Sequence, residues 1–109
     1  MTLSEFKSLL VNGLKKHRIS VYVYHRKAAK TADNYVVWGE VGKNSLRADG
    51  VTAEYSYMAA VDFYTKSEYS SVPDVIESIF ENAEISYGDA TIIYEDDTGF
   101  THYAWTVEF

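Results

Sequence analysis

The chain has 109 residues, close to the commonest length of a single domain, and 47% are apolar, so we expect one domain over residues 1–109 with a substantial core. It contains no cysteine, which excludes disulfides and thiolate chemistry, and no apolar run of the roughly 20 residues that span a bilayer, so we expect a soluble protein without membrane association. The net charge of −6 argues against broad affinity for nucleic acid.

The first predicted element is a helix over Leu3 to His17. Thr2 and Glu5 have the spacing of a capping box, and apolar residues recur on one stripe after them. Gly13 weakens this stripe, so we expect the helix to dock on a sheet rather than to be stable alone. A short strand over Ile19 to His25 follows, in which valines and tyrosines alternate between the two faces.

Two segments are predicted to be exposed loops around an inner strand over Tyr35 to Val41. Residues 26–34 are polar or small and carry three bases. Residues 42–50 are bounded by glycines and are too long for a tight hairpin turn, so we expect a projecting loop. Loops of this kind often carry function, and we treat both as candidate contact surfaces. Their candidate residues are Arg26, Lys27, Lys30, Lys43, Asn44, Leu46, Arg47 and Asp49.

The clearest period-two pattern lies over Ala53 to Lys66 and predicts the central strand of the sheet. A strand of this length exceeds the usual five or six residues, so we expect a bend or bulge within it. Its predicted inner face consists of Tyr55, Tyr57, Ala59, Val61 and Phe63.

A second helix is predicted after this strand, with Ser71 as its cap and Pro73 in its first turn. Its apolar residues keep helical spacing as far as Ala83, so we expect it to be the main cover of the core. The buried positions are predicted to be Val75, Ile76, Ile79 and Phe80. The outer face is predicted to be uniformly acidic, with Asp74, Glu77, Glu81 and Glu84.

Two strands are predicted to complete the chain, over Ile85 to Glu95 and over Phe100 to Phe109. Between them an acidic hairpin loop offers Asp96 and Asp97 as further candidate contact residues, with Gly99 available for positive φ. The predicted fold is therefore α+β, in the order α-β-β-β-α-β-β, with a mainly antiparallel sheet and two helices packed on one face.

No residue pattern indicates catalysis or cofactor binding. The histidines at 17, 25 and 102 lack metal-ligand spacing, and the acidic run from Glu95 to Asp97 lacks the alternating ligands of a calcium loop. Serine does not occur in a nucleophile elbow, and the glycines form no phosphate-binding loop. We expect neither enzymatic activity nor a metal or cofactor, and we keep a cleft formed only in the fold as an alternative.

Charge is divided unevenly along the chain. Residues 1–66 hold all ten Lys and Arg against six acids, a net charge of +4, whereas residues 67–109 hold ten acids and no base, a net charge of −10. The division is either an accident of a solvated surface or the mark of a head-to-tail contact, in which the basic edge of one copy meets the acidic edge of the next.

The layout resembles the tail terminator, or tail completion and head–tail joining, proteins of long-tailed phages. The resemblance covers nearly the whole chain and rests on the loop ending in Ala48, Asp49 and Gly50, the strand ending VDFYTK (61–66), and the final hairpin YEDDTGFTHYAWTVEF (94–109). It implies a non-catalytic subunit of a ring, commonly hexameric, in the virion tail or neck. Its partners would be the tail tube protein and the head–tail connector proteins, and it would be made in the cytoplasm of the bacterial host.

A second interpretation follows from the ten tyrosines, which suit half-exposed sheet faces and interfaces. In this interpretation the chain is a small host-side binding or regulatory module that uses a tyrosine-rich face of the sheet.

Overall fold

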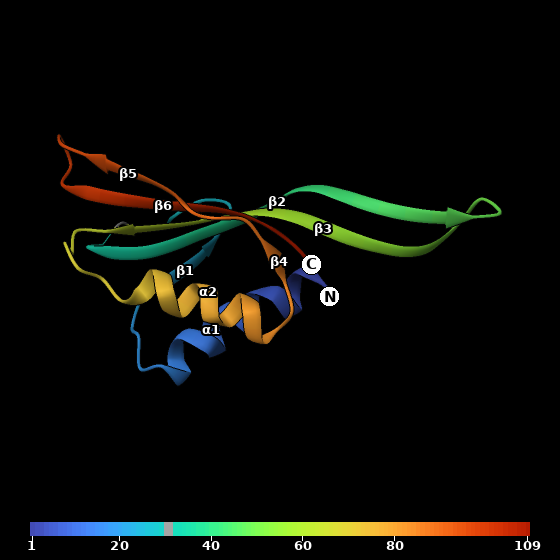
Figure 1. Cartoon of the computed structure of the whole chain (residues 1–109), viewed down its shortest axis with the longest axis horizontal. Helices are drawn as coiled ribbons and strands as arrows, with labels where there is room; N and C mark the ends of the chain where they lie inside the picture. The colour runs from blue at the N-terminus through green and yellow to red at the C-terminus, as the bar shows by residue number, and fades with distance from the viewer. Residues whose placement is uncertain (30–31) are drawn as a thin grey trace.

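A mixed sheet with two helices on one face forms the fold in the computed structural model, which describes residues 1–29 and 32–109 (Figure 1). The elements are α1 (Leu3–Lys16), β1 (Tyr22–His25), β2 (Asn34–Ala48), β3 (Val51–Thr65), α2 (Val72–Asn82), β4 (Ser86–Tyr87), β5 (Thr91–Glu95) and β6 (Phe100–Glu108). The strand order is β1-β2-β3-β6-β4, and β5 also pairs with β6. Among the described strands only β1 and β2 are parallel, so the predicted α+β class and mainly antiparallel sheet are confirmed.

Helix α1 begins with the predicted capping box. The backbone N–H of Glu5 donates to Thr2 Oγ1 at 3.1 Å, and the backbone N–H of Thr2 donates to Glu5 Oε1 at 2.9 Å. These two bonds satisfy amide groups that lack partners within the first turn of a helix. The apolar stripe of α1 is buried through Phe6, Leu10 and Leu14.

Helix α2 differs from its prediction at its start. Ser71 occupies the cap position but forms no side-chain capping bond, and Ser70 Oγ instead accepts from the Val72 amide at 3.2 Å. The physical reason is the backbone of Ser71, which is helical at φ −87° and ψ −8°, whereas a capping side chain reaches the amides from extended backbone. Ile76, Ile79 and Phe80 are buried as predicted, and Val75 is half-buried at the margin.

The two helices approach each other closely at Gly13. A Cβ atom on Gly13 would lie 2.6 Å from Cδ1 of Ile79, a buried side chain of α2. The glycine that weakens α1 in the sequence is therefore the residue that lets α2 pack against it.

The core lies between the helices and one row of the sheet. Cross-strand partners share a face, and the register aligns Val36 with Phe63 and Trp38 with Val61. Ala59, Val61 and Phe63 are fully buried, so the prediction of an inner face is confirmed for these three residues. Tyr57 is only half-buried and Tyr55 is 44% exposed, because the strand has left the helices at that point.

The prediction of a projecting loop over residues 42–50 is wrong, because β2 continues to Ala48 and β3 begins at Val51. The turn consists of Asp49 and Gly50, both at positive φ (53° and 78°), which is the conformation of a tight two-residue hairpin. The expected irregularity is present as two register shifts between β2 and β3, one at Glu40/Gly42 and one at Leu46/Arg47. The second shift falls at the beginning of the segment in which we expected it.

The strand predicted over residues 85–95 is interrupted. β4 and β5 both pair with β6, and their registers differ by one residue across Gly88, Asp89 and Ala90. The glycine and the extra residue weaken the ladder, as in a bulge at a sheet edge.

Candidate assembly interface

Beyond the helices, the β2–β3 hairpin continues as a two-stranded arm, which we define as residues 42–57 (Figure 1, green). The molecule measures 53 × 29 × 26 Å and has a radius of gyration of 15.0 Å, against about 13 Å for a compact domain of this length. Every residue from Val41 to Val51 is exposed, including Leu46 at 62% and Val51 at 68%. The predicted contact residues Lys43, Asn44, Leu46, Arg47 and Asp49 all lie on this arm.

Side chains near the base of the arm order it locally. Lys43 Nζ lies 4.4 Å from the ring centroid of Tyr55 and 5.6 Å from that of Tyr57, within cation–π distance of both. At an exposed site such a contact is worth about 0.5–1 kcal/mol, which is too little to compensate for the ordering of a long hairpin.

One edge of the sheet is basic. We define the basic edge as β1 together with Lys15 and Arg18 before it and Arg26 and Lys27 after it; the four bases are exposed. Arg26 is also held by Glu40, with an Nη2–Oε2 distance of 3.2 Å, while His25 Nε2 lies 2.8 Å from Glu40 Oε1. Lys30 lies outside the described residues.

Glu40 is the most strongly perturbed carboxyl in the described part of the chain. Hydrogen bonds from Arg26, then from His25 and from its own backbone amide, lower the pKa of Glu40 from 4.5 to about 2. Its side chain keeps 19% of its exposure. The carboxylate therefore ties β1 to β2 just where β2 leaves the body of the sheet.

Replacing Glu40 with Gln is expected to make the free energy of unfolding less dependent on pH below about pH 4.5. Because the folded pKa lies below the unfolded value, the stabilisation by the carboxylate is complete above about pH 4.5 and is lost as the pH falls towards 2. Urea midpoints measured between pH 6 and pH 2 should converge for the wild type and Glu40→Gln at the acid end. Glu68→Gln, at an exposed residue, is the control, and a gap between wild type and Glu40→Gln that is as large at pH 2 as at pH 6 contradicts the assignment.

The opposite edge is acidic. We define the acidic edge as β4 and β5 with Asp89, Glu95, Asp96 and Asp97. Asp96 and Asp97 lie in the β5–β6 turn, where Gly99 has φ of 77° and its amide donates to the Glu95 carbonyl at 2.8 Å. In residues 1–29 and 32–109, four close contacts join a basic and an acidic side chain, two of them through a histidine, and none of them uses an acid that follows Lys66.

The predicted contact residues thus form three separate surfaces. The arm projects at one end of the molecule and the β5–β6 turn lies at the other, with the basic edge along β1 (Figure 1). The sequence reasoning missed the exposed apolar strand β5, with Ile92 61%, Ile93 52% and Tyr94 63% exposed. The sequence signal for this strand is the run Thr91 to Tyr94, which is apolar on both faces and contains no charge. Charged side chains on an edge strand hinder its pairing with strands of other molecules, and this run lacks them.

The face of the sheet opposite the helices carries a cluster of aromatic rings. The Tyr64 ring stacks on Tyr35 at 4.8 Å and on His102 at 4.3 Å, and Phe100 meets both tyrosines edge-on. His102 Nε2 also lies 2.8 Å from Asp62 Oδ1. Burial raises the pKa of Tyr35 and Tyr64, with nearby carboxylates as a further cause. We call this cluster the tyrosine-rich face.

No protein-family model matches this chain, and no curated protein matches its sequence. Within the described residues, no group of three or more His, Asp or Glu side chains is arranged to hold a metal ion. None of the helices in this part of the chain is both long enough and apolar enough to cross a membrane.

Proposed function

We propose that this chain is a structural subunit of a long-tailed phage or prophage, and that its copies assemble as a ring that caps the tail tube and joins it to the head. The observation that carries the proposal is the exposed β2–β3 arm. An isolated two-stranded hairpin is marginally stable in water, because it lacks a second layer on which to bury a face. An arm with exposed Leu46, Val51 and Tyr55 is explained if another protein surface covers it in the assembly.

Two further features support assembly between like copies. The basic and acidic edges lie on opposite sides of the sheet, so each copy presents unlike surfaces, which suits a head-to-tail contact better than a two-fold one. The phage tail as the setting rests on the resemblance carried by residues 48–50, 61–66 and 94–109. In that setting the arm contacts the neighbouring subunit or the tail tube protein, and the complete ring faces the head–tail connector proteins.

Shortening the arm is expected to abolish assembly and to leave the body folded. Replacing residues 44–56 by Asn-Gly keeps the Lys43–Tyr57 pair as the base of a tight turn and removes no residue of the buried core. Light scattering and sedimentation over a range of protein and salt concentrations, with and without tail tube protein, should show oligomers for the wild type and monomers for the shortened chain. Thermal unfolding followed by circular dichroism is the folding control.

Each result bears on the proposal. A shortened chain that forms rings of wild-type size contradicts the role of the arm. A wild-type chain that stays monomeric under every condition, including with tail tube protein, counts against the ring itself.

The second candidate is a host-side binding module, and the observation that favours it is the tyrosine-rich face, which has no helix over it among the described residues (Figure 1). Tyrosine is enriched at interfaces because it joins a large apolar ring to a hydroxyl. Gene order separates the two candidates: neighbouring tail tube and portal genes support the ring subunit, and their absence supports the module.

A further inference from the structure

Strand β5 has the features of an edge strand that another strand covers. It pairs with β6 on one side only, among the described strands, and its first four residues are all exposed. The register places Ile92 opposite Tyr103 and Ile93 opposite His102, so Ile92 and Tyr94 point to the helix side and Ile93 to the open side. The first four residues of β5, Thr91 to Tyr94, carry no charge, and an edge of this kind is a template for pairing with another chain.

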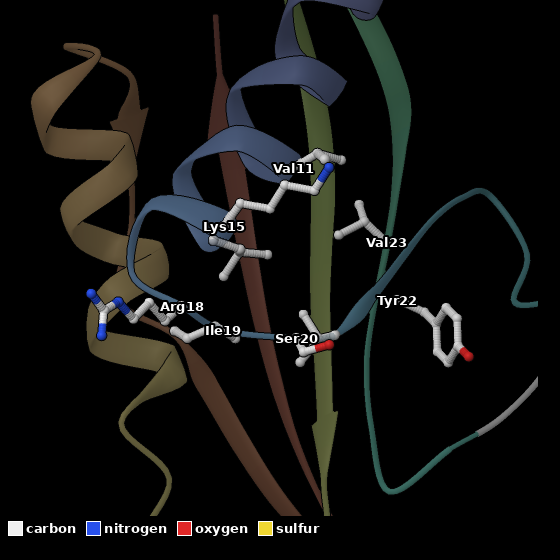
Figure 2. Close-up of a pocket in the computed structure, with 9 residues that line it drawn as sticks. Val11, Lys15, Arg18, Ile19, Ser20, Tyr22 and Val23 are labelled. Atoms are coloured by element: carbon white, nitrogen blue, oxygen red, sulfur yellow. The ribbon is translucent and has the colours of Figure 1, made fainter.

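The basic edge contains an apolar groove that suits the apolar side chains of β5. A groove of about 440 Å³ lies between the carboxyl end of α1 and β1 (Figure 2). Val11 on the helix and Val23 on the strand point towards each other across it, and Leu14, Ile19 and Val21 add further apolar lining. Lys15 and Arg18 also line it; the Lys15 side chain lies alongside Val11, and the Arg18 guanidinium points away from β1 (Figure 2). On the face of the sheet that carries the helices, the groove beside β1 therefore has room for apolar side chains of one more strand.

We infer that β5 of one copy adds to the outer edge of β1 of a second copy, with Ile92 and Tyr94 filling the groove between α1 and β1. This inference rests on the proposed ring and names the contact that closes it. The sheet then continues from subunit to subunit, and the apolar edge of β5 is covered by strand addition, a known mode of protein recognition.

The occupant is a second copy of this chain because its charges match the groove. Cations lie at both ends of β1 (Lys15 and Arg18, then Arg26 and Lys27), and acids lie at both ends of β5 (Asp89, then Glu95 to Asp97). Those acids form no ion pair within the described residues, so they remain available to a neighbour. The contact also uses two unlike surfaces, as a closed ring requires.

Strand directions predict how the two strands meet. β1, β2 and β6 run one way, and β3 and β5 run the other. A ring rotation about an axis along the strands leaves these directions unchanged, so β5 meets β1 of the next copy in antiparallel orientation. In that orientation the turn with Asp96 and Asp97 lies beside Lys15 and Arg18, and Asp89 lies near Lys27.

The first test compares two neighbouring isoleucines in the full chain. Ile92→Ser removes a side chain that fills the groove and is expected to weaken self-association about tenfold to a hundredfold in sedimentation. Ile93→Ser removes the same side chain from the open face and is expected to weaken it at most about threefold. Both residues are exposed in the single chain, so circular dichroism melts should match the wild type. Equal effects of the two substitutions overturn the inference.

The second test uses the absence of native cysteine. The double variant Ser20→Cys with Thr98→Cys places one thiol beside the start of β1 and one in the β5–β6 turn, both at exposed residues. A short bismaleimide should produce a ladder of crosslinked oligomers from this variant and only monomers from either single variant. The pair Ala29→Cys with Thr98→Cys tests the parallel orientation and should crosslink poorly.

The outcomes separate the contact from the proposed function. Oligomers in sedimentation without the crosslinked ladder overturn the β5–β1 contact and leave the ring standing. Crosslinking of a single variant shows a two-fold contact and overturns the inference. Monomers under every condition overturn both.

Discussion

Replacing Phe6 with Ala is expected to lower the free energy of unfolding by about 3–5 kcal/mol, because a large cavity is left in a core that relaxes only partly. Phe6 is fully buried, and its ring lies 5.1 Å from Trp38, 6.4 Å from Phe80 and 4.2 Å from Phe109. The side chain therefore joins α1, β2, α2 and the carboxyl terminus. Against a typical total stability of about 5–15 kcal/mol, this loss is about a fifth of the total or more.

Urea unfolding followed by tryptophan fluorescence measures the loss at Phe6. Phe6→Leu keeps most of the volume and should cost less than about 1.5 kcal/mol. Tyr69→Ala, at a side chain that is 88% exposed, should stay within about 0.5 kcal/mol of wild type. A loss for Phe6→Ala no larger than that for Phe6→Leu would show that α1 does not hold the core together.

The body of the fold is predictable because its signals are local and agree with one another. The capping box at Thr2 and Glu5 fixes the start of α1, and helical spacing identifies Ile76, Ile79 and Phe80 as buried. The alternation of Ala59, Val61 and Phe63 gives the inner face of β3, because that half of the strand lies over the helices.

The arm was missed because its sequence has the composition of a loop. Residues 42–50 are polar and glycine-bounded, and an alternating apolar face is absent there because neither face packs on a core. The useful signal was Asp49 followed by Gly50, which is the strongest short sequence for a two-residue hairpin turn.

The candidate interface is less predictable than the fold, because it depends on which distant residues share an edge. The charge division was visible in the sequence, but the sheet order that places β1 and β5 at opposite edges was not. The bond between Glu77 and Trp105 shows the same limit. Helical spacing assigned Glu77 to a solvent-facing row, whereas its Oε2 accepts from Trp105 Nε1 at 2.9 Å and the side chain is half-buried.

That bond leads to the second large expected effect, a difference between the two tryptophans. Trp38 and Trp105 are each 2% exposed, and each loses the same atoms on replacement by Phe. Trp105→Phe also removes the hydrogen bond to a carboxylate, worth about 1.5–3 kcal/mol. Within the described residues Trp38 Nε1 has no hydrogen-bond partner, so Trp38→Phe removes a buried donor whose desolvation is uncompensated, and this offsets part of the lost packing.

We therefore expect Trp105→Phe to lower the free energy of unfolding by about 1.5–3 kcal/mol more than Trp38→Phe does. Urea unfolding followed by far-ultraviolet circular dichroism measures both, because each variant lacks one of the fluorescent reporters. A double-mutant cycle of Trp105→Phe with Glu77→Ala isolates the bond, and Glu77→Gln, which retains an acceptor oxygen, should lose less than Glu77→Ala. Equal losses for the two tryptophans, together with zero coupling in the cycle, would mean that the Trp105–Glu77 bond does not fasten α2 to β6.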